Sequence, residues 1–235
     1  MEKELFFEKV DQLKKEMETD TQAAIANYEK RLLPELVNDF YEILNNVKRN
    51  GGNELISFVK KSDFTEAPAS TRFHSAFRGG LLLHSLIVYY SFLQLKESAP
   101  WDKILNMNDE SIILITLCHD LCKTYFYGTE PRNKKVYKDN GSKKDSMGRY
   151  DWESILAFTC DDKYPLGHGE KSVIFLQQFV HLSMSEIMCI RWHMGFSDSD
   201  GQHSYLSKAF RLHPEVLALH EADMRATYLW EFSEN

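Results

Sequence analysis

The chain of 235 residues has a formal net charge of −7, with 43% apolar and 27% charged residues. This length suits one large domain, or a domain with a small addition, and it is long enough to bury a real core. An acidic chain is not built to coat nucleic acid through its overall charge, although a local basic pocket is compatible with it. No segment approaches the roughly 20 apolar residues that cross a membrane, and the charged N-terminus does not resemble a signal peptide. These features predict a cytoplasmic protein that makes no membrane contact.

Cysteine spacing argues against a zinc ribbon. The four cysteines, Cys118, Cys122, Cys160 and Cys189, form no CxxC pair. Cys118 and Cys122 lie one helical turn apart in an apolar segment. They are therefore predicted to be reduced, buried and small apolar residues rather than metal ligands.

The N-terminal region is rich in residues that favour helices. Residues 3–50 are mostly Glu, Lys, Leu, Gln and Ala, and Pro34 predicts a break between two helices. The sequence Asn50-Gly51-Gly52-Asn53 predicts where the second helix stops. We expect residues 1–60 to form accessory helices. They are either a plain packing pair or a candidate homodimerisation element.

Two apolar helices and an insertion are predicted next. Residues 81–90 follow Gly79-Gly80 and form a nearly all-apolar run, which predicts a buried helix. Asn108 is a candidate N-cap for a second apolar helix, from Ser111 to Lys123. Residues 127–167 mix basic and aromatic residues around the turn signal Asp139-Asn140-Gly141, which predicts a small β-hairpin or irregular insertion. This insertion directly follows the second helix, which carries His119 and Asp120 near its end. We therefore expect the insertion to cover any site that these two residues form and to help select what binds there.

The C-terminal third is predicted to be helical with one loop. A helical pattern runs from Gly169 to Leu176, and Ser183 or Ser185 is a candidate cap for the next helix. Residues 196–207 are predicted to be a loop. Pro214 suits the first turn of a last helix that ends near residue 230. The predicted fold class is therefore mainly all-α, with a small β insertion.

Histidine and aspartate interrupt the apolar segments at three separate places. His84 lies in the first buried helix, His119-Asp120 in the second and Asp223 in the last. A buried ionised carboxylate costs several kcal/mol unless it is paired or coordinates a cation. Each residue alone could be a hydrogen-bonded core group, but one metal site would account for all of them together.

Five segments carry a more specific pattern. They are Gly79-Gly80-Leu81-Leu82-Leu83-His84-Ser85, His119-Asp120-Leu121-Cys122-Lys123, Gly167-His168-Gly169, Arg191-Trp192-His193-Met194-Gly195 and His220-Glu221-Ala222-Asp223. In this order they resemble the HD superfamily of metal-dependent phosphohydrolases, whose motifs include GGLLxHS, HDxxK and HxAD. The resemblance covers roughly residues 72–230. It implies an HD helical bundle as the domain of residues 61–235.

Within this superfamily the segments resemble the HD domain of bacterial 3′–5′ exoribonucleases and, more loosely, the HD-GYP cyclic-dinucleotide phosphodiesterases. The chain departs from both. It has predicted helices where the exoribonucleases have an N-terminal oligonucleotide-binding β-barrel, and it has no GYP segment. It also has His193-Met194 where the branch often has two adjacent histidines. These departures leave the substrate open.

The resemblance implies a role for each ligand. His84, His119, Asp120 and Asp223 would bind one metal, and Asp120 would bridge to a second one held by His168 and His193. The cofactors would be two divalent ions of the Mn, Fe, Mg, Ni or Co class. Two such ions, about 3.5–4 Å apart, activate a water for attack on phosphorus.

Basic residues near the ligands are candidates for substrate binding. Lys123 lies one turn after His119, where it could hold a phosphate oxygen and assist Asp120 in catalysis, or simply cap a helix. Arg72, His74 and Arg78 precede the Gly-Gly pair and could bind phosphate or lie on the surface. The remaining histidines are expected not to be ligands, and His220 could support Asp223.

The sequence therefore predicts a metal-dependent phosphohydrolase that acts on a nucleotide or a short oligonucleotide. One alternative is a one-metal enzyme similar to HD 5′-nucleotidases. The other is a nucleotide-binding module without turnover.

Overall fold

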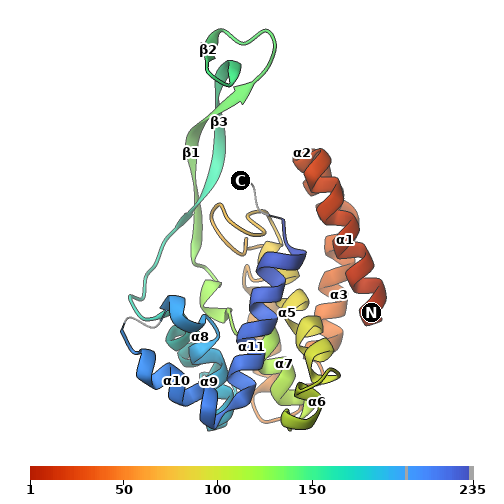
Figure 1. Ribbon diagram of the computed structural model, residues 1–235, viewed down its shortest axis with the longest axis vertical. Coiled ribbons are helices and arrows are strands. Elements are labelled where there is room, and N and C mark those ends of the chain that lie inside the picture. Colours follow the sequence, from red (N-terminus) through yellow and green to blue (C-terminus); the bar gives the residue numbers. More distant parts are fainter. Residues whose placement is uncertain (199–200, 233–235) are drawn as a thin grey trace.

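The computed structural model describes residues 1–198 and 201–232, and it is mainly helical with one small sheet (Figure 1). This confirms the predicted fold class. The α-helices are α1 (Lys3–Thr19), α2 (Thr21–Asn27), α3 (Leu33–Leu44), α4 (Gly52–Lys61), α5 (Gly80–Lys96), α6 (Trp101–Ile104), α7 (Asp109–Leu117), α8 (His168–Leu176), α9 (Met184–Trp192), α10 (His203–Leu212) and α11 (Pro214–Arg225). The strands are β1 (Tyr127–Tyr137), β2 (Lys143–Asp145) and β3 (Gly148–Cys160). None of the described helices is long and apolar enough to span a membrane.

Helix α5 is the centre of the helical body. Leu82, Ile87 and Val88 lie on different sides of it, and all three are completely buried. Helices α3, α7 and α11 pack around α5. A helix that is apolar on all sides has no face suited to water, so it is covered on every side. His84 is buried because it belongs to this helix.

The N-terminal helices share the hydrophobic core of the rest of the chain. The ring of Phe6 stacks on Tyr90 of α5 at a centroid distance of 4.4 Å. Phe7 packs against Trp230 near the other end of the chain, at 4.3 Å. Helix α1 therefore covers α5 and the C-terminal segment together.

The helical break near the N-terminus lies at Asp20 rather than Pro34. Asp20 ends α1 and caps α2 by accepting a hydrogen bond from the Ala23 amide. Residues 28–32 form a π-helical turn that leads directly into α3, and Pro34 occupies the first turn of α3. Proline needs no hydrogen-bond acceptor there, so it does not interrupt the helix. The predicted break at Pro34 is wrong for this reason.

Helix α7 is shorter than predicted because a side chain takes one of its carbonyl groups. The helix ends at Leu117, and residues 121–123 form a separate 3₁₀ turn. The Nδ1 of His119 lies 2.7 Å from the carbonyl oxygen of Thr116, which would otherwise accept the amide of Asp120. His119 and Asp120 therefore stand in a turn and not on a helix.

The predicted loop at residues 196–207 is also partly wrong. Residues 195–198 form a 3₁₀ turn, and α10 begins at His203. Leu206 and Ala209 of α10 are buried, and Phe210 packs against the core. These residues follow helical spacing, which was the available signal.

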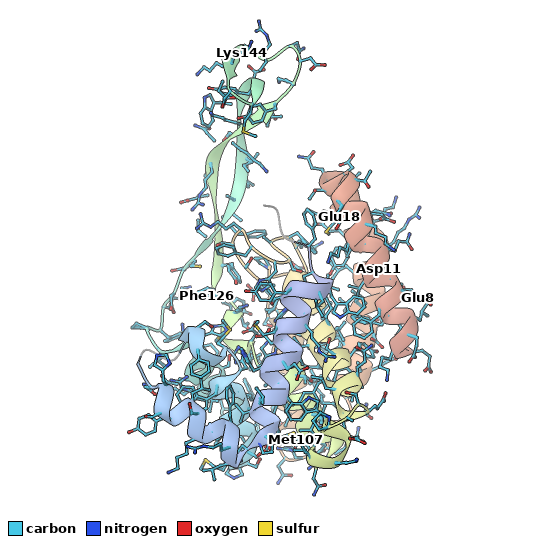
Figure 2. All side chains as sticks on the ribbon, in the orientation of Figure 1. Glu8, Asp11, Glu18, Met107, Phe126 and Lys144 are labelled. Carbon is cyan, nitrogen blue, oxygen red and sulfur yellow. The ribbon has the colours of Figure 1, made fainter. Side chains whose placement is uncertain are left out.

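Residues 127–160 form a long arm that projects away from the helical body (Figure 1). The sheet order is β1-β3-β2, and the antiparallel register pairs Tyr127 with Cys160 and Tyr137 with Tyr150. Phe126 lies at the base of the arm and Lys144 near its tip (Figure 2). The expectation that this insertion covers the site is therefore wrong for the sheet. Within the sheet, Tyr127 at the base lies near the predicted metal ligands, because its hydroxyl donates to the Ala69 carbonyl oxygen that also accepts from Lys123.

Candidate metal centre

The six predicted metal ligands come together in the core from separate parts of the fold. The helical contributors are His84 of α5, His168 at the start of α8, His193 at the end of α9 and Asp223 of α11. The turn after α7 adds His119 and Asp120. All are buried except His168 and Asp223, whose side chains are 26% and 13% exposed. These two side chains are therefore the ones of the six that are in contact with solvent.

Asp120 lies at the middle of the cluster. Its Oδ2 is 3.7 Å from Nε2 of His84 and 3.5 Å from Nε2 of His119. Its Oδ1 is 3.6 Å from Nε2 of His193 and within hydrogen-bonding distance of Nε2 of His168. Asp223 joins on one side, with Oδ1 at 3.2 Å from Nε2 of His84.

Hydrogen bonds outside the cluster fix the tautomers of three histidines. The Nδ1 of His119 faces the Thr116 carbonyl oxygen at 2.7 Å, and the Nδ1 of His193 faces the Ile190 carbonyl oxygen at 2.7 Å. The Nδ1 of His84 faces a carboxylate oxygen at 3.1 Å. These oxygens only accept hydrogen bonds, so each Nδ1 carries a proton, and each Nε2 faces the cluster as the nitrogen that can take up a further proton or a metal cation. This is the arrangement of histidines that bind metals.

The Nε2 atoms require a positive charge between them. Those of His84 and His119 are only 3.2 Å apart, and two lone pairs at this distance repel unless a proton or metal cation lies between them. The buried Nε2 of His193 has no hydrogen-bond partner among the described residues. An unsatisfied buried polar atom of this kind costs free energy, which a bound cation would recover. The donors present therefore fit a metal ion.

The protonation of the cluster has a clear pattern. Burial lowers the pKa of His119 to about 3, so this residue stays neutral. Burial also opposes the charge on His84, but Glu231 and Asp223 outweigh it and raise the pKa of His84 to about 10. Asp120 raises the pKa of His168 to about 10 against the same opposition. Two positions in the cluster therefore attract a positive charge.

Asp120 remains ionised in spite of its burial. Burial would raise its pKa, but the charges of Lys123 and His168 hold the pKa of Asp120 well below its usual range. The Nζ of Lys123 lies 2.7 Å from Oδ2 of Asp120 and 2.7 Å from the carbonyl oxygen of Ala69. Lys123 is thus in contact with the cluster. This position is compatible with the predicted role of holding a phosphate oxygen and also with support of the Asp120 carboxylate.

Glu231 belongs to the site and was missed by the sequence analysis. Its Oε2 accepts the Nδ1 proton of His84, and its Oε1 accepts a hydrogen bond of 2.6 Å from the Ser75 hydroxyl. This fully buried carboxylate orients the imidazole and keeps its Nε2 directed at the cluster. Its position between Trp230 and Phe232 was a weak signal for a buried charge.

The Gly79-Gly80 pair brings the segment before α5 against the site. A Cβ on Gly80 would lie 2.0 Å from the Ser75 carbonyl oxygen, and Gly79 has a φ of +78°. Only glycine permits this close approach and this backbone conformation. The packing places Ser75 and the Ala69 carbonyl group beside Glu231 and Lys123.

Of the three predicted substrate-binding residues before α5, one lies at the cluster. The half-buried His74 has its ring centroid 5.3 Å from that of His84. Arg78 instead pairs with Glu66 on the surface at 2.8 Å, and the Arg72 guanidinium lies over the Phe73 ring. Neither arginine is brought into contact with the cluster.

Two other residues contact ligands in ways that the sequence did not indicate. Cys122 is buried, as predicted, but its sulfur lies 3.2 Å from Nδ1 of His168, so it belongs to a possible donor group with Asp120. His220 places its Nδ1 2.6 Å from the carbonyl oxygen of His193. It therefore supports His193 rather than Asp223.

Comparison of the chain with protein-family models, curated proteins and solved structures found no match. The helical fold and the buried His/Asp cluster are compatible with an HD domain. Three groups of side chains among the described residues could each hold a metal ion. Two of them share Asp120: His84, His119 and Asp120, and Asp120, Cys122 and His168. The third group is His74, His84 and Glu231.

Proposed function

We propose that the protein is a metal-dependent phosphohydrolase of the HD superfamily, acting on a nucleotide or short oligonucleotide with two divalent cations. One observation carries this proposal: two of the three donor groups share Asp120. A carboxylate with one oxygen toward each group is placed to bridge two cations. The raised pKa values of His84 and His168, one in each group, support two cation positions.

Different residues of the chain would have different roles in such a reaction. Divalent cations held here would supply Lewis acidity, which activates water and neutralises phosphate charge. Asp120 would fix the distance between the two positions, and Glu231 would hold His84 in its binding orientation. The Lys123 ammonium group has three N–H donors, of which two face Asp120 and Ala69. The third N–H would hold a phosphate oxygen. His74, whose ring lies beside that of His84, would be a second contact for the substrate.

A substrate screen tests the proposal. Purified full-length protein with Mn²⁺ is offered nucleoside mono-, di- and triphosphates, cyclic dinucleotides and short RNA, and the released products are quantified. Cleavage of at least one class is expected, and Asp120→Asn should reduce it to the level of metal-free protein. Asp109→Asn is the matched control, because Asp109 is exposed at the start of α7. The proposal fails if no class is cleaved, or if Asp120→Asn retains full activity.

A further inference from the structure

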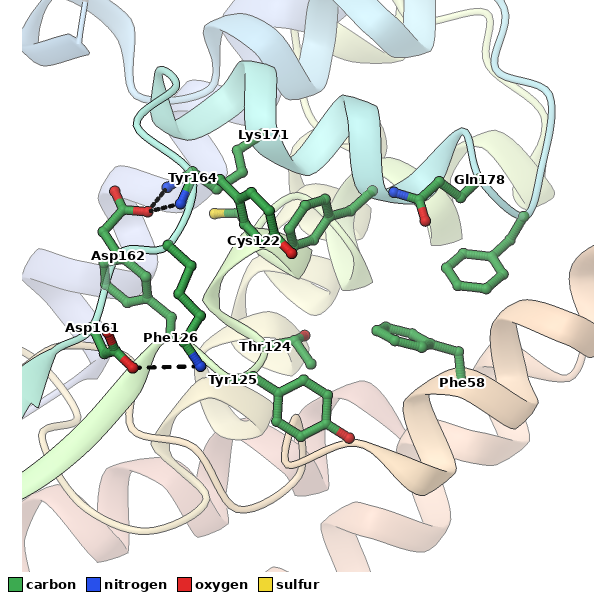
Figure 3. A pocket seen from close by; sticks show the side chains of 13 residues that line it. Phe58, Cys122, Thr124, Tyr125, Phe126, Asp161, Asp162, Tyr164, Lys171 and Gln178 are labelled. Carbon is green, nitrogen blue, oxygen red and sulfur yellow. Dashed lines mark hydrogen bonds and ion pairs between the residues drawn. The ribbon is translucent and has the colours of Figure 1, made fainter.

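A pocket lined with aromatic rings lies at the base of the arm (Figure 3), and its lining residue Cys122 contacts His168 of the metal cluster. Its volume is about 360 Å³, near the lower end for a small-molecule site. Six rings line it: Phe58, Tyr125, Phe126, Tyr164, Phe175 and Phe179. The pocket thus has the size of one small ligand or of one small group of a larger ligand.

The rings form flat walls on opposite sides. Figure 3 shows Phe58 and Tyr125 on one side of the pocket, and Tyr164 with Gln178 on the other. Phe58 packs on Phe179 with centroids 4.8 Å apart, and Tyr164 meets Phe175 edge to face at 5.6 Å. Walls of this kind favour a planar aromatic ligand that can stack on them.

Two polar side chains in the pocket lack partners. The Thr124 hydroxyl is buried, and it makes no hydrogen bond within the described part of the chain. Figure 3 shows this hydroxyl directed into the pocket. The Gln178 amide is exposed at the rim of the pocket, where it has no hydrogen bond to a described residue and offers both donors and an acceptor. A ligand that satisfied both groups would carry donors and acceptors on its edge.

The charged groups of the pocket do not favour a phosphate. Lys171 is paired with Asp162 at 2.6 Å, and Lys163 with Asp161 at 3.4 Å. Each cation therefore has a carboxylate beside it, and the two pairs have no net charge. A neutral planar ring with a hydrogen-bonding edge fits this lining better than an anion does.

The pocket and the cluster are separated by one imidazole ring. Cys122 lines the pocket, and its sulfur lies 3.2 Å from Nδ1 of His168. The opposite nitrogen of His168, Nε2, hydrogen-bonds Asp120 in the cluster. In a nucleotide, a sugar ring separates the base from the phosphate on a similar scale.

We propose that this pocket binds the base of the nucleotide whose phosphate is held at the metal cluster. This inference rests on the proposed function. It assigns Thr124 and Gln178 to recognition of the edge of the base, and the aromatic walls to stacking. The segment of residues 120–124 connects the two parts, because it supplies both Asp120 and Thr124.

Nucleosides without phosphate test the pocket separately from the chemistry. Adenosine, guanosine, cytidine and uridine are titrated into EDTA-treated full-length protein, and binding is measured by calorimetry. At least one should bind. Thr124→Val keeps the side-chain shape and should weaken that binding by roughly fivefold or more, without lowering the thermal midpoint. An unchanged thermal midpoint separates ligand recognition from a structural role.

A second variant tests stacking. Tyr164→Ala should weaken binding of the same nucleoside by roughly fivefold or more. Tyr205→Ala is the matched control, because Tyr164 and Tyr205 are 56% and 67% exposed, and Tyr205 lies on α10, outside the pocket. The control should bind like the unmodified protein.

The outcomes distinguish the two proposals. If no nucleoside binds, and both variants hydrolyse substrate with unchanged KM, the pocket assignment is wrong and the phosphohydrolase proposal stands. If nucleosides bind and the variants lose that binding, but the unmodified protein cleaves nothing in the screen, the pocket stands and the hydrolase proposal fails.

Discussion

At the scale of single residues, the contact that each histidine makes outside the cluster decides what it offers inside. The Nδ1 atoms of His84, His119 and His193 are occupied by oxygen acceptors. Their Nε2 lone pairs are therefore directed inward. The sequence segments around His84 and His119 predicted the clustered histidines, but they contained no information about Glu231, which is 147 residues from His84. Such an orienting partner depends on the tertiary fold.

Glu231→Gln tests the orienting contact. Glutamine has one oxygen and one NH2 group where glutamate has two oxygens. It therefore cannot accept the His84 proton with one terminal atom and the Ser75 proton with the other, so the imidazole loses part of its support. We expect metal affinity about 10–100-fold weaker, measured by competition with a fluorescent chelator. The matched control is Glu66→Gln, because Glu66 pairs with Arg78 on the surface. Equal Mn²⁺ affinity in the two variants would show that Glu231 does not position the ligand.

At the scale of elements, the strands of the arm pack against one another and hardly at all against the helical body. The strands pair with one another, and each has only sparse contact with any helix. The Asn-Gly turn signal and the mixed composition predicted a hairpin, but they could not predict its length or its direction. Those depend on how the two strands leave the body, at Tyr127 and Cys160.

Removing the arm tests this separation. Gly128 and Thr159 are register partners, so residues 129–158 can be replaced by a two-residue Asn-Gly turn. We expect the thermal midpoint of the helical body to change by no more than about 5 °C. Circular dichroism at 222 nm would follow the unfolding. Phe6→Ala serves as the sensitive control, because the loss of a fully buried ring should cost about 3–5 kcal/mol. If removing the arm lowered the thermal midpoint by more than Phe6→Ala does, the arm would not be separate from the helical body.

A buried ion pair joins the loop after α3 to the start of α9. Arg49 donates two hydrogen bonds to Glu186, at 3.0 and 2.9 Å, and Glu186 also completes the capping box with Ser183. Burial opposes the charge on Glu186, but the hydrogen bonds from Arg49 hold its pKa below the usual 4.5. The carboxylate therefore stabilises the fold above pH 4.5, and this contribution is lost as the pH falls through the lowered pKa.

Glu186→Gln should remove this pH dependence. We expect the variant to be less stable by about 2 kcal/mol at neutral pH, with the difference shrinking at acidic pH. Urea unfolding of both proteins, from neutral pH down to about pH 3, measures the difference directly. Glu54→Gln, on the exposed face of α4, is the control. A difference that stays constant over this range would exclude the assigned role of the Glu186 carboxylate.

At the scale of the whole molecule, periodicity predicted the helical class and the buried helices α5 and α7. It did not predict where helices end when side chains compete for backbone groups, as His119 does at Thr116. His84, His119, Asp120 and Asp223 could be singled out because each interrupts an apolar segment, whereas His168 and His193 were singled out only through the family resemblance. The aromatic pocket was not, because its rings come from four separated parts of the chain that meet only after folding.

The central claim is that the cluster around Asp120 binds two metal ions, and metal content measures it most directly. The protein is loaded with Mn²⁺, desalted and analysed by mass spectrometry of the metal. We expect about two equivalents per chain, about one in a His168→Gln/His193→Gln double variant, and less than one in Asp120→Asn. No retained metal in the unmodified protein, or equal retention in Asp120→Asn, would contradict the account.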